Sequence, residues 1–262
     1  MLFLLRQIRR KTLMNNKFTT YLLYAIGEII LVVVGILIAI SIDDWNESKN
    51  ERAQEQIILR QLKVEYQKNL EQLEQKMVMR NEMLEAATRL LQFKDEPPSA
   101  KKDSLLLCMS SLMRDPTFDP IQNDLIASGN LRLIRNDTLR QMLANWTSDI
   151  LQVQEVEKQW QEVRTGIVIP GYLKMGILRD LTDQLWKDGY TPVEALDGTI
   201  SIQHRIYPSK NGLTANEILE NEELEGIASL AITFCQIGNI QSRALRDRII
   251  SIDQLITSGI DK

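Results

Sequence analysis

Few side chains in this sequence have the types and spacing that catalysis requires. The 262 residues contain one histidine, His204, and two cysteines, Cys108 and Cys235. A lone histidine and two distant cysteines do not make a zinc site. The sequence also lacks a glycine-rich phosphate loop, a Gly-x-Ser-x-Gly elbow, a His-x-x-x-His pair and a Cys-x-x-Cys pair. We therefore predict a protein that is not an enzyme, with no catalytic residue, no metal site and no cofactor.

One carboxylate stands out by its surroundings. Glu28 is the only formal charge in the 22-residue run from Tyr21 to Ile42. If this run is a helix, three small or branched residues share its face, and Gly35-x-x-x-Ala39 is a spacing that lets two membrane helices approach closely. The pattern predicts a membrane helix–helix contact through Gly27, Glu28, Val32, Gly35 and Ala39. Two alternatives stay open: Glu28 reaches back to the lipid headgroups, or it belongs to a proton or ion path.

The run that carries Glu28 is long enough to cross a bilayer. Twenty-two helical residues reach about 33 Å, against about 30 Å of hydrocarbon. Residues 1–20 carry five basic side chains and no acid, whereas Asp43, Asp44 and Glu47 follow the run. This asymmetry predicts an inner-membrane span over residues 21–42, a cytoplasmic basic or interfacial segment over residues 1–20, and an exported, periplasmic domain over residues 43–262. The alternative is a signal peptide cleaved after Ala39-Ile40-Ser41.

The exported part is acidic and has the composition of a helical protein. Residues 43–262 contain 26 Lys and Arg against 34 Asp and Glu, a net charge of -8. This balance argues against a nucleic-acid partner. With only 12 glycines and 7 prolines in the chain, the composition predicts an all-α fold, a helical bundle.

The first helix of the bundle is predicted to be long. Residues 45–93 contain no proline or glycine, and apolar residues recur at three- and four-residue steps. Asn69 and Arg80 interrupt this seam, so we expect packing on the chain's own domain rather than a strict coiled coil. Further helices are expected from an N-cap at Asp103 to about Met113, from Asp119 or Pro120 to a left-handed cap at Gly129, over residues 138–164 with Asn136 or Asp137 as the cap, and over residues 175–186. Thr214 or Asn216 then starts the closing helices, which end in a long run from about Glu222 to Ser258.

Residues 165–213 are predicted to be largely irregular, because prolines and glycines punctuate them. A small extended pair could form over residues 199–202 and 204–207. Long loops often carry binding residues, so this stretch offers a candidate ligand or partner patch of Tyr172, Trp186, Tyr190, His204, Arg205 and Tyr207. Local packing is the competing interpretation.

Two sequence blocks resemble a known family. Residues 24–39, YAIGEIILVVVGILIA, followed by Trp45-Asn46, are similar to the N-terminal signature of single-span proteins of unknown function that are common in Bacteroidota. A second similar block is Ser128 to Ile134, followed by Asn136 and Leu139. The resemblance implies an inner-membrane anchor with a periplasmic helical domain, and it implies no activity.

An exported location adds two expectations. Asp103-Ser104-Leu105 and Asp137-Thr138-Leu139 resemble the acidic-hydroxyl-apolar sites of periplasmic O-glycosylation in Bacteroidota, although both are equally good helix caps. Ser104 and Thr138 are therefore candidate modification sites. Cys108 and Cys235 lie in apolar runs and are expected to be buried free thiols, with a disulfide between them as the alternative.

These features together predict an accessory or scaffold subunit that contacts the lipid bilayer and joins a membrane protein partner or a homo-oligomer. The first alternative is a periplasmic sensor that binds a ligand and signals through a membrane partner. The second is a proton- or ion-path component that uses Glu28.

Overall fold

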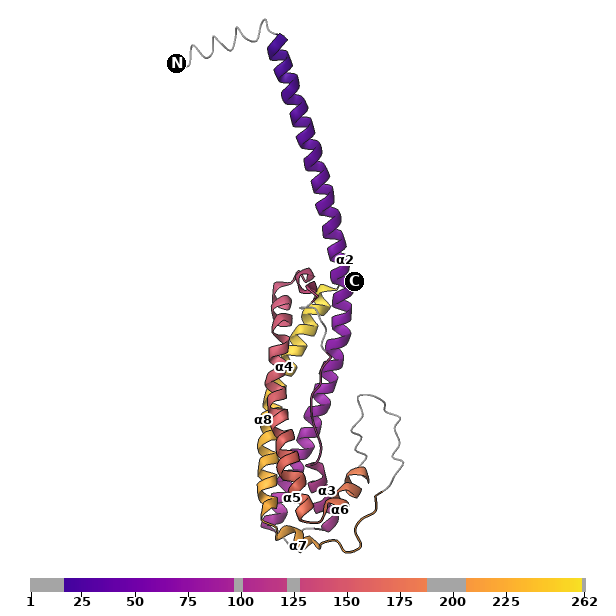
Figure 1. The fold of residues 1–262 in the computed structure, drawn as a ribbon, viewed down its shortest axis with the longest axis vertical. Coiled ribbons are helices and arrows are strands. Elements are labelled where there is room, and N and C mark those ends of the chain that lie inside the picture. Colours follow the sequence, from indigo (N-terminus) through magenta and orange to yellow (C-terminus); the bar gives the residue numbers. More distant parts are fainter. Residues whose placement is uncertain (1–16, 97–100, 122–127, 188–205, 261–262) are drawn as a thin grey trace, which may run out of the picture. The chain divides into compact units, whose positions relative to one another are not determined.

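The computed structural model describes residues 17–96, 101–121, 128–187 and 206–260 (Figure 1). These residues form helices and connecting segments and contain no strand, so the predicted all-α class is confirmed for them. The contacts divide the chain into two units, Met1–Ile57 and Ile58–Lys262. The proposed extended pair around residues 199–207 lies almost wholly outside the described residues.

One helix, α2, runs from Lys17 to Asp95 without a break. The predicted span and the predicted long amphipathic helix are therefore parts of a single helix. Within the second unit, α2 buries an apolar side that includes Leu59, Leu62, Leu73, Met83, Ala87 and Leu90, which confirms packing on its own domain. The helix ends two residues before Pro97, as expected for a residue that cannot continue a helix and restricts the one before it.

Helix α3 spans Lys102–Ser111 and buries Leu105, Leu106, Cys108 and Met109. The predicted cap, Asp103, is two residues off: Lys101 has the extended backbone of the N-cap, and Asp103 lies inside the first turn. There its carboxylate still favours the helix by facing the positive end of the helix dipole.

The helix predicted to begin at Asp119 or Pro120 does not begin there. Residues 114–121 are irregular, because side chains of α2 take the place of helical partners for their backbone. Asn69 pairs with the N–H and the carbonyl of Ile121 at 2.7 and 2.9 Å, and Gln72 accepts from the N–H of Asp119 at 3.1 Å. Residues 122–127 of this predicted helix lie outside the described residues. Gly129 is left-handed as predicted, with φ of 72°, and a short 3-10 helix, η2, follows it over Asn130–Leu133.

Helix α4 spans Asp137–Val163 and begins as predicted, with the side chain of Asn136 accepting from the N–H of Leu139. The stretch directly after it is more regular than predicted, because a π-helical turn, η3 (Arg164–Val168), leads into α5 (Ile169–Lys174). The helix predicted over residues 175–186 is confirmed as α6 (Leu178–Lys187). Pro170 has no N–H to give, and the wide π turn lets the chain pass it without leaving the helical path.

The chain closes with α7 (Ala215–Leu219) and α8 (Glu223–Gly259). Thr214 caps α7, and Glu217 completes a reciprocal capping box. In the second unit, α4 and α8 lie along α2 (Figure 1). The buried apolar residues of this unit form two separate clusters, one reaching down α2 to Leu73 and the other starting at Met83.

Candidate functional site

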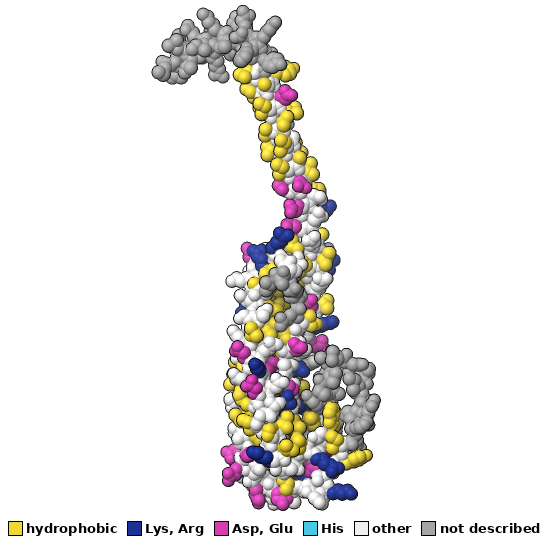
Figure 2. Space-filling view, in the orientation of Figure 1, with side chains coloured by type: hydrophobic (Ala, Val, Ile, Leu, Met, Phe, Trp, Pro, Cys, Tyr) yellow, Lys and Arg dark blue, Asp and Glu magenta, His cyan; other side chains and the backbone are white. Residues whose placement is uncertain are grey.

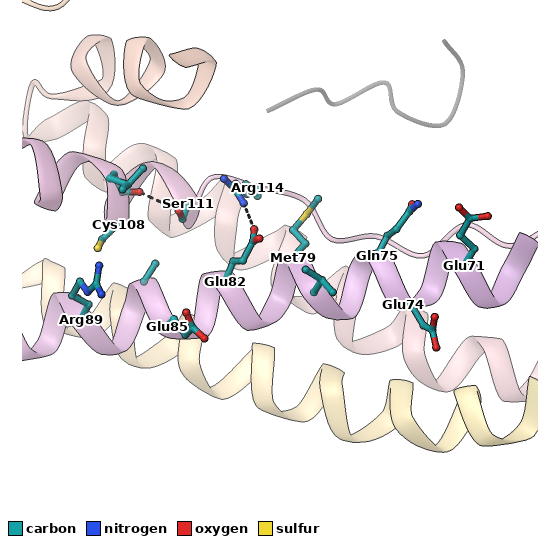
Figure 3. A pocket seen from close by; sticks show the side chains of 13 residues that line it. Glu71, Glu74, Gln75, Met79, Glu82, Glu85, Arg89, Cys108, Ser111 and Arg114 are labelled. Atoms are coloured by element: carbon teal, nitrogen blue, oxygen red, sulfur yellow. Dashed lines mark hydrogen bonds and ion pairs between the residues drawn. The ribbon is translucent and has the colours of Figure 1, made fainter. Parts of the chain in front are cut away.

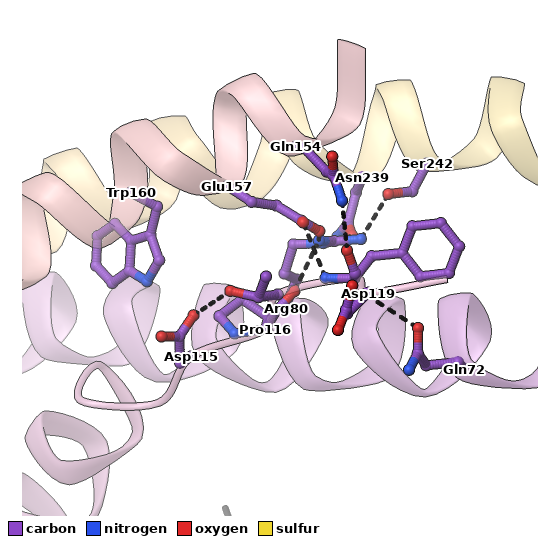
Figure 4. A network of polar contacts seen from close by, with 12 residues as sticks. Gln72, Arg80, Asp115, Pro116, Asp119, Gln154, Glu157, Trp160, Asn239 and Ser242 are labelled. Carbon is purple, nitrogen blue, oxygen red and sulfur yellow. Dashed lines mark hydrogen bonds and ion pairs between the residues drawn. The ribbon is translucent and has the colours of Figure 1, made fainter. Parts of the chain in front are cut away.

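A polar layer separates the two apolar clusters. Its centre is Arg80 on α2, of which only 2 % is exposed. The guanidinium donates from Nη1 to Glu157 Oε1 on α4 at 2.5 Å, from Nε to Asn239 Oδ1 at 3.1 Å and from Nη2 to Ser242 Oγ at 2.5 Å, the last two on α8. Arg80 thus links all three long helices of the second unit (Figure 4).

The same layer fastens the irregular segment after α3. Arg80 Nη1 also donates to the carbonyl of Pro116 at 3.3 Å, and the second oxygen of Glu157 accepts from the N–H of Phe118 at 2.9 Å. Gln154 donates to the carbonyl of Phe118 at 3.2 Å. Every nitrogen of the Arg80 guanidinium therefore has a partner, which is what a charge buried this deeply requires.

Burial dominates the electrostatics of this layer. It raises the pKa of the Glu157 carboxyl above its ordinary value, against the opposing pull of Arg80 and of the Phe118 N–H. Burial also raises the pKa of the nearby Cys235 thiol, to about 12. The layer links α2, α4 and α8 through buried hydrogen bonds.

The residues of the candidate membrane contact lie in the first unit, and no described side chain covers them. Glu28, Val32 and Ala39 are exposed, and Cβ atoms added to Gly27 and Gly35 would meet nothing within 4 Å. Glu28 forms no ion pair with any described residue. Figure 2 shows hydrophobic side chains covering this part of α2. By length and composition, α2 includes a segment that could cross a membrane.

The three described members of the aromatic patch differ in their surroundings. Tyr172 is fully buried in the core, Trp186 is half-buried on α6, and Tyr207 is exposed with its carbonyl accepting from Arg179 Nε at 2.7 Å. Burial raises the pKa of the Tyr172 phenol. Tyr190, His204 and Arg205 lie outside the described residues. Among the described members, Tyr172 serves core packing.

The remaining predicted residues are placed as follows. Ser104 is half-buried in the first turn of α3, and Thr138 is exposed in the first turn of α4. Cys108 and Cys235 are buried free thiols. The part of the chain that the structure describes holds no cluster of three or more metal-ligating side chains.

The polar layer was missed from the sequence, although its traces were visible. Arg80 and Asn69 appeared as breaks in the apolar seam of α2. Glu157 lies 77 residues from Arg80, and Asn239 lies 159 residues away, so only the fold pairs them. A useful signal is that each long helix carries polar residues on its apolar side.

Comparison with curated proteins and with solved structures finds no significant match. A family model does match part of the chain. The matched stretch begins at Glu28, includes Gly35, Ala39 and Trp45, and ends before the second resembling block at Ser128. The similarity that the chain shows is thus to the family described as "Family of unknown function (DUF6090)", over residues 28–103.

Proposed function

We propose that this protein is a non-enzymatic, bitopic inner-membrane protein that acts as an accessory or scaffold subunit of a membrane complex or homo-oligomer. The observation that supports this most is the open face of Gly27, Glu28, Val32, Gly35 and Ala39 on α2. Its carboxylate has no ion pair with a described residue, and its two glycines have free space above them.

Such a face is unfavourable in direct contact with lipid. A carboxylate within the hydrocarbon layer is unfavourable by about 2.5 kcal/mol or more near the centre of the span, and it is normally compensated by protein or water. Gly35 and Ala39 offer the close backbone approach on which membrane helices depend, since lipid tails are as apolar as leucine. A second membrane helix packed on this face would satisfy both requirements.

The orientation belongs to the same proposal. Five basic residues before the span place residues 1–20 in the cytoplasm, and the acidic domain then lies in the periplasm. The resemblance to Bacteroidota single-span proteins supports this arrangement.

The test is purification from the native membrane in mild detergent, followed by sizing and mass spectrometry, with Glu28→Gln and Gly35→Leu beside the wild type. Ser41→Leu is the matched control. It adds comparable bulk on the opposite side of the helix, where the Ser41 hydroxyl donates only to the carbonyl of Leu37. We expect a defined assembly for wild type and Ser41→Leu, and its loss in the two face variants. A wild type that is monomeric and alone would overturn the proposal.

A further inference from the structure

A groove runs along the second unit between α2 and α3. It has a volume of about 790 Å³, and its walls come from α2, from α3 and from Arg114 just beyond α3 (Figure 3). Along α2 it extends from Glu71 to Arg89, a helical rise of about 27 Å. A site this elongated suits an elongated occupant.

The groove has apolar side chains at two places. Val78 is 57 % exposed and Met79 is half-buried next to it on α2. Toward the Arg89 end, Leu107 of α3 is half-buried, and Ala86 and Cys108 are buried (Figure 3). Exposed apolar residues rimmed by polar ones are typical of an interaction surface.

The rim is acidic. Four glutamates and two arginines line the groove, which leaves a net charge of -2. Two of the glutamates are already paired, Glu82 with Arg114 at 2.6 Å and Glu74 with Arg246 at 2.7 Å. Glu71 and Glu85 form no ion pair with any described residue. They are therefore the carboxylates with charge to offer a partner, and together with Arg89, one turn after Glu85, they leave the groove a charge of -1 that no described ion pair compensates.

We propose that this groove binds a cationic amphipathic helix of a partner protein. Its apolar residues would lie on Val78, Met79 and Leu107, and its Lys or Arg side chains would face Glu71 and Glu85. A second copy of this chain fits less well, because a two-fold contact would set one net-negative groove against another. The inference does not depend on the proposed membrane contact, which lies in the other unit.

The probe is a pair of labelled helical peptides of about 18 residues, long enough to span the groove. Both carry leucines at three- and four-residue steps, and the other positions are lysine in one peptide and glutamate in its counterpart. Binding to the full chain in phosphatidylcholine nanodiscs is measured by fluorescence anisotropy, with empty discs as the blank. We expect the lysine peptide to bind more tightly than the glutamate peptide.

Two variants test the residues. Glu71→Gln with Glu85→Gln should weaken binding of the lysine peptide by about threefold to tenfold, the range for two exposed charge pairs. Val78→Ser should weaken it by removing apolar contact without adding a charge. The matched controls are Glu155→Gln with Glu162→Gln, and Leu151→Ser, all at exposed positions of α4; they should bind like wild type. Equal binding of both peptides, or equal losses in the controls, would refute the proposal.

A photo-cross-linking residue at position 78 identifies the natural occupant in the native membrane, with position 151 as the control. An adduct with a helical segment rich in Lys and Arg supports the proposal. An adduct with a second copy, with another part of the same chain or with a neutral or acidic segment overturns it, as does an adduct yield no higher than at position 151.

Discussion

The buried ion pair of Arg80 and Glu157 is not explained by stability alone, because a buried ion pair adds little stability compared with a well-packed apolar pair. The desolvation of two charges can cost as much as their attraction returns. Here the pair does more than attract, since Arg80 also bonds Asn239, Ser242 and the carbonyl of Pro116. We infer that the layer specifies one register of α2, α4 and α8, which two apolar clusters alone would leave less defined.

A double-mutant comparison separates specificity from stability. Glu157→Leu leaves the buried Arg80 charge uncompensated, and it should lower the free energy of unfolding of the full chain by about 3 to 5 kcal/mol. Arg80→Met with Glu157→Leu removes both charges and should cost clearly less than the single change. Urea unfolding followed by circular dichroism measures both. If the double variant is less stable than the single one, the polar layer contributes net stability through its hydrogen bonds and ion pair, and its main role is not to specify the register of the helices.

The raised pKa of Glu157 predicts a pH dependence with a definite sign. A carboxyl whose pKa is higher in the folded than in the unfolded state favours folding below its unfolded pKa, and this contribution is lost as the pH rises through the folded pKa. Wild type should therefore gain stability relative to Glu157→Gln as the pH falls from neutral toward about 4.3, the ordinary value for glutamate. Melting temperatures of the two proteins across this range provide the measurement. If the melting temperature of wild type falls relative to that of Glu157→Gln on acidification, the attraction of Arg80 lowers the pKa of Glu157 by more than burial raises it.

At the scale of elements, α3, α4, α6 and α8 were predictable from the local sequence, whereas η3, α5 and the irregular path of residues 114–121 were not. Apolar residues at helical spacing predict α4 and α8, and Asn136 predicts where α4 begins. By contrast, Pro170 suggested irregular structure, yet the π turn of η3 accommodates it. The irregular path of residues 114–121 depends on Asn69 and Gln72 of a distant helix, a tertiary effect that local propensity does not contain.

Substitution of two glycines by alanine should change the stability of the protein in opposite directions. Gly129 has φ of 72°, where a Cβ is strained, so Gly129→Ala should destabilise the protein by about 1 kcal/mol or more. Gly226 is exposed in the first turns of α8 with nothing within 4 Å of an added Cβ, so Gly226→Ala should stabilise it by about 0.5 to 1 kcal/mol. Thermal unfolding of both variants checks the pair. Destabilisation by Gly226→Ala would mean that its surface is covered in the protein's native assembly.

At the scale of the whole molecule, charge and hydropathy together make one argument about topology. An apolar stretch of α2 lies between five basic residues on its N-terminal side and a domain of net charge -8. Basic residues next to a span are retained in the cytoplasm far more strongly than acidic residues are expelled. The orientation should therefore depend on Arg9, Arg10 and Lys11 rather than on Asp43 and Asp44.

Single-cysteine labelling tests this dependence, with little background because Cys108 and Cys235 are buried and burial raises the pKa of both thiols. In cells with a permeabilised outer membrane, an impermeant maleimide should label Leu151→Cys at once and Thr12→Cys only after the inner membrane is broken. Changing Arg9, Arg10 and Lys11 to glutamate should lower the labelling of Leu151→Cys, whereas Asp43→Asn with Asp44→Asn should leave it unchanged. The opposite labelling pattern would invert the proposed topology. A mature Thr12→Cys protein that lacks residue 12 by mass would instead establish cleavage after Ser41, and the membrane face would then be absent from the working protein.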